Sequence, residues 1–472
     1  MTFKLTISKI LAFLWTILIL VTLAVFSLST QRQFPDSVGY INMGLGLMEG
    51  KFSSWYFLED FYPETLRMPG YPLFLGVLIK IFGSQISIFA IQYILLLFTY
   101  YLSYKILNNI ISTDLQKRAS LIFLLISILS IQLPYYAGQI APQSLTIFFI
   151  VLFFYIITLK VKSSLKIGVV NGFIFSVLFQ LMPSILILPI LIFSIAIFYR
   201  KSISSYLISL SIFALSLLPF GFWNLSNHGV FKITPLEGGA GVAHMGYWQY
   251  KLPKNYLEKF YWGNNTGDDI IYPFRESEEL TISNLVKFES EWRDIKSLIE
   301  NKNIELDISK KEKMEINNLG QFVLGNSSYV IEREKLLWNY TISNIIEDPV
   351  YYCKTRFYAF LRSYFSGVSE SALINANSLK QKLNIIYPFL VTFTLVFLGI
   401  VFIFYNMINK WRLLSFELKI MFITIIYFGL IHTPFATQAR YTIPVHMLVF
   451  LLVSFFISPH LKWLSNLINR FR

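Results

Sequence analysis

The stretch ILAFLWTILILVTLAVFSL, which runs from Ile10 to Leu28, is the first of several long apolar runs in this chain. It contains no charged residue and is long enough to cross the hydrocarbon core of a bilayer, which takes roughly 17 to 25 residues. It is too long for the apolar core of a signal peptide, and no clear small-residue cleavage site follows it. We therefore expect this stretch to remain in the protein as a membrane-spanning helix.

The overall composition extends this expectation to the whole chain. Hydrophobic residues make up 55% of the sequence and charged residues 14%, whereas soluble domains carry roughly 25% charged residues. The net charge of +13 would suggest nucleic acid in a soluble protein. Here Lys and Arg gather at the ends of apolar runs, where they set orientation. We expect contact with membrane lipids and no nucleic-acid partner.

Apolar runs recur on both sides of a polar middle region and predict an all-α polytopic membrane protein with about ten transmembrane helices. The predicted spans are Ile10–Leu28, Ile86–Leu107, Leu121–Leu133, Ser144–Leu159, Ile167–Leu181, Ile185–Phe198, Leu207–Phe222, Ile385–Phe404, Leu418–Ile431 and Thr442–Ile457. They divide the chain into an N-terminal transmembrane region (1–222) with a first outer loop (29–85), a large loop (223–384) and a C-terminal transmembrane region (385–472).

The basic residues predict the orientation of these spans. The side that receives both termini also receives most of the Lys and Arg, for example Lys117, Arg118 and Arg200. The positive-inside rule makes that side cytoplasmic. We expect a multi-pass protein of a bacterial inner membrane with both termini in the cytoplasm and the large loop outside. The segment Tyr71–Phe82 is short and contains Lys80, which favours a half-inserted helix; a full crossing would invert the topology downstream.

The large loop has helical periodicity and predicts a helical cap on the outer face. From Glu278 to Ile299, apolar residues recur at helical spacing among charges. A later helix is expected to begin after Glu347-Asp348-Pro349, because acids and a proline suit a helix N-terminus. Its aromatic and basic residues fit either a position at the lipid headgroups or an ordinary amphipathic helix packed on the cap.

Chemistry is expected at the outer membrane surface, because the predicted spans contain almost no ionisable residue. The first outer loop is the richest segment, and in it Asp36 and Tyr40 are four residues apart. On a helix that begins at Asp36, both side chains face the same way. Such a carboxylate can accept a proton from a hydroxyl or an amine. The alternative is that Asp36 only caps the helix.

The motifs of the outer segments resemble those of the GT-C superfamily of membrane glycosyltransferases. Asp36, Tyr40 and Gly50 follow the first span, and Arg67-x-Pro-Gly-Tyr71-Pro leads into an apolar helix. Further along stand Pro219-Phe-Gly-Phe-Trp-Asn224, Gly229-Val-Phe231 and Gly238-Gly239, and then Arg440-Tyr441-x-x-Pro444. Their order along the chain is most similar to the branch of protein O-mannosyltransferases and lipid A aminoarabinose transferases.

The resemblance implies transfer of a sugar from a polyprenyl-phosphate donor to a lipid, polysaccharide or protein acceptor on the extracytoplasmic face. Asp36 matches the family's catalytic carboxylate and would act as general base, with inversion at the anomeric carbon. Arg67 and Arg440 are candidates to bind the departing phosphate, because a guanidinium stays charged and grips phosphate well. The alternatives are an ion pair of Arg67 with Glu64 or Asp60, and a simple helix-end anchor for Arg440.

Other residues complete the predicted substrate-binding set. Where many relatives carry an acid, this chain has Gln143, which can bind a sugar hydroxyl but cannot act as a base. The remaining candidates are Tyr40, Glu59, Asp60, Tyr71, His244 and Tyr441. Glu59 and Asp60 are compatible with a divalent cation, but the sequence implies no metal requirement and contains no metal-ligand spacing of histidines.

Two other function classes stay open from the sequence. A polysaccharide polymerase or ligase would also use a polyprenyl-linked donor, but it needs an outer loop rich in Arg and His, whereas acids follow the first span here. A transporter or lipid flippase would have paired halves and polar groups at mid-membrane. Neither of these transporter features is present in the sequence.

Overall fold

The computed structural model describes residues 7–28, 35–111, 113–159, 163–201, 203–249, 251–252, 278–301, 327–365 and 373–460. All regular elements within these ranges are helices. Parts of the predicted first outer loop (29–34) and of the predicted large loop (253–277, 302–326 and 366–372) lie outside the described residues.

Every predicted span falls on helical chain. The helices concerned are α1 (Ile7–Leu28), α4 (Ile86–Ile110), α5 (Thr113–Leu129), α6 (Gln132–Ala137), α7 (Gln143–Thr158), α8 (Ser164–Leu181), η1 (Pro183–Ile187), α9 (Leu188–Phe198), α10 (Ile203–His228), α18 (Leu379–Val391), η2 (Thr392–Phe397), α19 (Leu398–Lys410), α20 (Phe416–His432), η5 (Ile443–Val445) and α21 (His446–Ile457). Among the described residues, 5 helices are long and apolar enough to cross a membrane. The protein is therefore a helical membrane-type bundle, while ten crossings and their orientation stay predictions.

One predicted span is wrong as a continuous helix. Instead of running unbroken over Leu121–Leu133, the chain ends α5 at Leu129 and begins α6 at Gln132. Pro134 explains the break, because proline has no N–H for a helical bond to the carbonyl of Ser130 and its ring would clash with that carbonyl.

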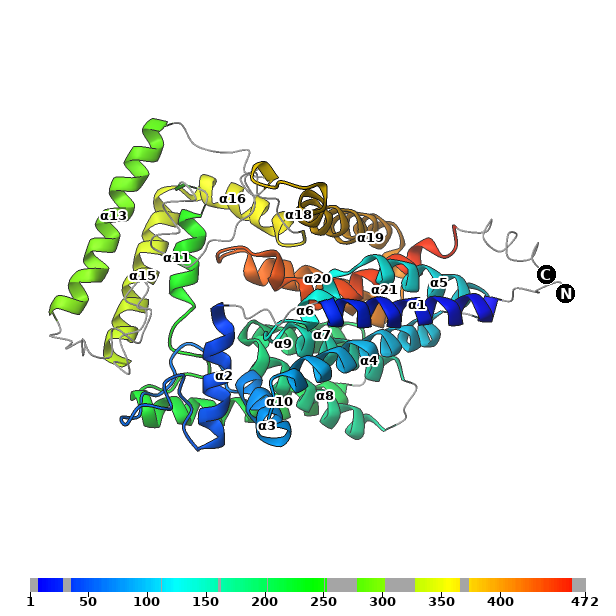
Figure 1. The fold of residues 1–472 in the computed structure, drawn as a ribbon, viewed down its shortest axis with the longest axis horizontal. Coiled ribbons are helices and arrows are strands. Elements are labelled where there is room, and N and C mark those ends of the chain that lie inside the picture. Colours follow the sequence, from blue (N-terminus) through cyan, green and yellow to red (C-terminus); the bar gives the residue numbers. More distant parts are fainter. Residues whose placement is uncertain are drawn as a thin grey trace.

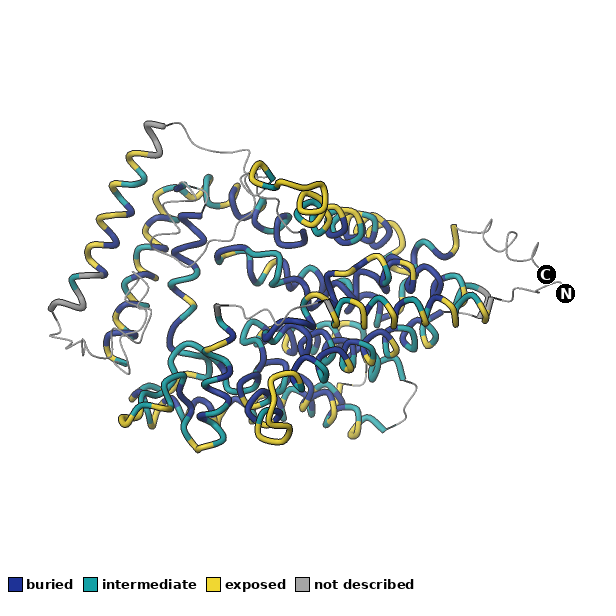
Figure 2. The backbone as a smooth tube through the Cα atoms, viewed as in Figure 1, coloured by how far each residue is buried: buried dark blue, intermediate teal, exposed yellow. Residues whose placement is uncertain are grey.

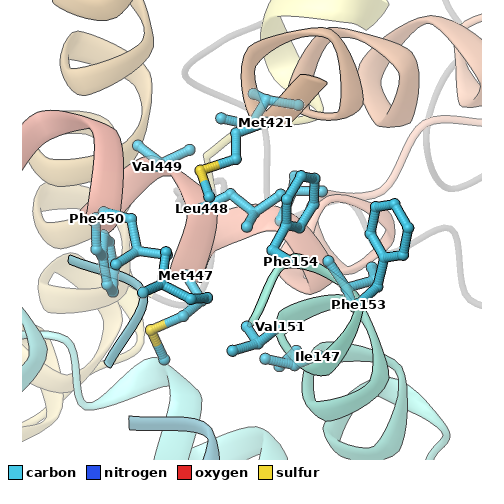
Figure 3. Packing of buried hydrophobic residues seen from close by; sticks show 14 of the residues in the cluster. Ile147, Val151, Phe153, Phe154, Met421, Met447, Leu448, Val449 and Phe450 are labelled. Atoms are coloured by element: carbon cyan, nitrogen blue, oxygen red, sulfur yellow. The ribbon is translucent and has the colours of Figure 1, made fainter. Parts of the chain in front are cut away.

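Helix α21 forms the centre of the bundle. Its residues from His446 to Val453 are all buried, as expected for a helix that is apolar on every side. Figure 3 shows Met447 and Leu448 of α21 close to Ile147, Val151 and Phe154 of α7, with Met421 of α20 nearby. This buried core runs through the bundle in Figure 2. The segment just before α21 is thereby fixed at one end of the bundle.

The first outer loop contributes two helices, α2 (Pro35–Met48) and α3 (Gly70–Phe82), which cross at two glycines. A Cβ atom built on Gly44 would lie 2.6 Å from the carbonyl oxygen of Pro72 and 2.8 Å from the backbone nitrogen of Gly76. No side chain fits between the two backbones. This contact fixes α2 against the segment that follows Arg67. Helix α3 has 13 residues, about 20 Å, so it is shorter than the hydrocarbon core of about 30 Å.

The described part of the large loop is helical, as predicted, and its helices are called the cap below. It consists of α11 (Ala240–Trp248), α13 (Glu278–Asn301), α15 (Ser327–Glu347) and α16 (Pro349–Arg362). Helix α16 begins where the sequence predicts, and the Asp348 side chain accepts a hydrogen bond from the N–H of Tyr351. In Figure 1, α13 and α15 lie at the end of the molecule away from the start of α1 and the end of α21.

The glycine crossing predicts a selective loss of stability. In Gly76→Ala the new Cβ would meet the Gly44 carbonyl oxygen at well under contact distance, so the helices must separate, at a cost of about 1–3 kcal/mol. Gly39→Ala, also on α2, is the matched control because nothing lies within 4 Å of its Cβ position. We expect a lower melting temperature in detergent for Gly76→Ala and no loss for Gly39→Ala. Equal melting temperatures for both variants would contradict this packing.

Candidate functional site: a carboxylate between two arginines

Asp36 lies in the first turn of α2, at the end of the bundle nearest the cap. Because α2 begins at Pro35, Asp36 is inside the helix rather than at the cap position. Its carboxylate is one-quarter exposed (25%) and faces side chains from two distant parts of the chain. The interpretation of Asp36 as a simple N-cap therefore does not describe its contacts.

Arg67 joins Asp36 to Tyr40. Its Nη2 donates to Oδ1 of Asp36 at 2.9 Å, and its Nη1 donates to the Tyr40 hydroxyl at 2.9 Å. The guanidinium carbon also lies 4.4 Å from the centre of the Tyr40 ring. Asp36 and Tyr40 thus share one face of the helix, as their spacing predicts.

The alternative partners of Arg67 have other contacts. Glu64 accepts hydrogen bonds from the Ser54 hydroxyl and from the N–H of Leu66, and it acts on Arg67 only electrostatically. Asp60 is exposed and accepts a hydrogen bond from the Tyr62 hydroxyl. The ion pair that the structure gives to Arg67 is the one with Asp36.

Arg440 approaches the same carboxylate from the other end of the chain. Its Nη1 lies 3.7 Å from Oδ2 of Asp36, the oxygen that Arg67 does not contact. Arg440 belongs to η4 (Ala439–Tyr441), just before the central helix α21. It is therefore more than an anchor at a helix end, because it faces the predicted catalytic residue.

The two guanidinium groups keep Asp36 charged. Burial raises the pKa of its carboxyl, but the charges of Arg67 and Arg440 and the hydrogen bond from Arg67 lower it. The net result is a pKa below the usual value of 3.8. At neutral pH the site holds one carboxylate and two guanidiniums, which leaves a net positive charge. Such a site can bind a hydroxyl group beside an anion such as phosphate.

A buried arginine, Arg356, ties the segment that carries Arg440 to the cap. Arg356 of α16 donates from Nη1 to the carbonyl oxygens of Thr433 (2.9 Å) and Phe435 (3.1 Å), and from Nη2 to that of Gly246 (2.6 Å). The N–H of Ala436 donates to the Val242 carbonyl at 2.9 Å. The position of Arg440 thus depends on α11 and α16 as well as on the bundle.

Two of the predicted binding residues, Tyr71 and Tyr441, lie beside members of the site. Tyr71 is buried, donates to Gln92 and packs edge-on against Tyr40 at 5.1 Å between ring centres. Gln143 is buried at the start of α7. Tyr441 stacks on His432 at 4.9 Å beside Arg440. Their binding roles stay predictions.

The structure does not bring Glu59, Asp60 or His244 to Asp36. Glu59 and Asp60 are exposed in an irregular turn. His244 is fully buried in the cap, where its Nε2 lies 2.7 Å from Oε2 of Glu291. Among the residues that the structure describes, no group of three or more His, Cys, Asp or Glu side chains forms a metal site.

In comparisons with known proteins, no family model, no curated protein and no solved structure matches this chain.

Sequence reasoning missed two members of this region, Tyr136 of α6 and Arg362 of α16. Burial raises the pKa of Tyr136 to about 12, and the charges of Arg440 and Arg362 act on its phenol in the opposite direction. Arg362 therefore acts electrostatically on the same phenol as Arg440, while its Nη1 donates to the carbonyl oxygen of Phe365 at 2.6 Å. In the sequence it was one of several basic residues on an amphipathic helix, and no pattern distinguished it.

The lowered pKa of Asp36 predicts how its ion pairs affect stability. Asp36→Asn leaves two guanidiniums without their carboxylate and should reduce the unfolding free energy by about 1.5–3 kcal/mol at pH 7, the usual range for hydrogen bonds to charged groups. A lowered folded-state pKa means that this contribution is present above about pH 4 and is lost as the pH falls through the folded-state pKa. Melting temperatures of wild type and Asp36→Asn should converge only in that acidic range. Glu59→Gln, an exposed change in the same loop, is the control and should have no effect. A difference in melting temperature between wild type and Asp36→Asn that stays constant down to pH 3 would contradict the ion pairs assigned to Asp36.

Proposed function

We propose that this chain is a membrane glycosyltransferase that moves a sugar from a polyprenyl-phosphate donor to an acceptor on the extracytoplasmic face of the membrane. The observation that carries the proposal is the Asp36 carboxylate with Arg67 at one oxygen and Arg440 at the other. The resemblance of the surrounding motifs to GT-C enzymes supports the same activity.

The proposed step needs one base and a site for the departing phosphate. The acceptor hydroxyl oxygen attacks the anomeric carbon, the bond from that carbon to the phosphate oxygen breaks, and its electron pair leaves with the phosphate. The hydroxyl proton passes to Asp36. The transition state resembles an oxocarbenium ion, as in glycoside hydrolysis, so the proton leaves late, when the acceptor oxygen is strongly acidic. A carboxylate with a low pKa is basic enough for that role.

The two arginines supply the positive charge that stabilises the departing phosphate. Negative charge grows on the phosphate as the bond breaks, and fixed cations stabilise it most when they are already in place. Arg67 and Arg440 are fixed in this way, Arg67 by Asp36 and Tyr40 and Arg440 through the segment that Arg356 holds. When phosphate binds, the guanidiniums would share their donors between it and Asp36, which also places the base next to the bond that breaks.

Replacing Asp36 tests this function. Mass spectrometry of surface glycans and lipids, from cells with the chain deleted and then restored, should identify a sugar that depends on the chain. Asp36→Asn should lower its transfer by about 10²–10⁴-fold, the usual contribution of a general base, and Glu49→Gln, an exposed change just after α2, should not. Folding of both variants is checked by size-exclusion profile and melting temperature. Full activity in folded Asp36→Asn protein would exclude the mechanism and would favour a polymerase, a ligase or a transporter.

A further inference from the structure

A buried ionic network lies behind the loop that carries Arg67. Arg333 of α15 donates from Nη2 to Oε2 of Glu237 at 2.5 Å, and both side chains are only 6% exposed. The other oxygen of Glu237 accepts a hydrogen bond from the hydroxyl of Thr65. The backbone N–H of Glu237 also donates to the carbonyl oxygen of Thr65 at 3.1 Å. Glu237 therefore holds Thr65 by both its side chain and its backbone.

A second contact holds the residue before Thr65. His228, at the end of α10, has Nε2 3.1 Å from the carbonyl oxygen of Glu64 and Nδ1 2.7 Å from the hydroxyl of Ser327 at the start of α15. The backbone of Glu64 and Thr65 is thus tied to the same cap helix twice, through Arg333 and through Ser327.

The position of Glu237 is itself determined by the cap. Gly238 follows it with a φ of +94°, a left-handed conformation that glycine adopts readily. Helix α11 then begins, and the N–H of Ala240 donates to Oε2 of Glu334 at 3.0 Å. Arg333 also lies 3.4 Å from the other oxygen of Glu334. Arg333 therefore joins two carboxylates that fix the turn before α11.

Arg67 lies between two helices in a segment without regular structure, so contacts from other parts of the chain position it. Between the end of α2 at Met48 and the start of α3 at Gly70, the described chain contains no helix. Thr65 is two residues from Arg67, so their Cα atoms are at most about 7 Å apart. Contacts that hold Thr65 therefore limit where the Arg67 guanidinium can reach.

We propose that Arg333 is a positioning residue for the transfer reaction and acts through Glu237 and Thr65 to hold Arg67 beside Asp36. This inference rests on the proposed function for its kinetic consequences, but its geometric consequence can be measured without it. Arg333 lies in the cap and contacts Arg67 only through this chain of residues.

A double-mutant cycle tests whether Arg333 acts on the reaction through Arg67. Arg333→Met should lower kcat at least tenfold with a smaller change in KM, and Arg333→Lys should restore part of the loss. In an Arg67→Met background, Arg333→Met should cause little further loss, because the residue that it positions is already absent. Glu291→Gln, which changes a buried carboxylate of the cap bonded to His244 and Asn344, is the matched control and should combine additively with Arg67→Met. Additive losses for Arg333→Met would overturn the proposal.

Thr65→Val keeps the test valid if Arg333→Met fails to fold. It removes one hydrogen bond to Glu237 and leaves the buried ion pair intact. We expect a reduced kcat in protein that still folds with a somewhat lower melting temperature, and an unchanged kcat would overturn the proposal.

A labelling experiment separates this inference from the proposed function. Leu66→Cys is introduced into a chain in which Cys353, the single native cysteine, is replaced by Ser. Maleimide labelling at position 66 should become at least severalfold faster when Thr65→Val or Arg333→Met is added. This result is expected whatever reaction the chain catalyses, so absent sugar transfer with faster labelling would reject the proposed function alone. An unchanged labelling rate would reject the positioning role.

Discussion

The Asp36 carboxylate receives a guanidinium at each of its oxygens, and the two arginines come from opposite ends of the chain. Arg67 follows α2 in the first outer loop, whereas Arg440 precedes the last described helix. Charges of this kind are costly to remove from water unless they are paired. Pairing with Asp36 thus favours the arrangement in which residues 36, 67 and 440 converge at one end of the bundle.

The rest of the structure supports this convergence in three ways. The contact between Gly44 and Gly76 holds α2 against α3. It therefore keeps Asp36, at the start of α2, near Arg67, which precedes α3. The buried helix α21 holds the segment of Arg440 at the bundle end. The cap then holds each arginine-bearing segment through a buried arginine of its own, Arg333 for Arg67 and Arg356 for Arg440. The cap therefore acts as a scaffold for the site.

Local patterns in the sequence predicted local structure well. Apolar runs located the helices, the spacing of Asp36 and Tyr40 predicted their common face, and the acids before Pro349 predicted the start of α16. The apolar run before Pro134 masked the break after α5, although a proline ends or kinks a helix. Such patterns could not predict the contacts between segments that are distant in the sequence. Neither the partner of His244, which is Glu291, nor the link from Arg333 to Thr65 leaves a periodic signal, because each depends on how separate helices pack.

Binding of a polyprenyl monophosphate, measured by native mass spectrometry on purified protein, tests most directly whether Arg67 and Arg440 form a phosphate site beside Asp36. We predict that Arg67→Met and Arg440→Met each weaken binding at least tenfold. Asp36→Asn should bind at least as tightly as wild type, because removing the carboxylate leaves more guanidinium donors for the phosphate. Wild-type affinity in both arginine variants would contradict the account.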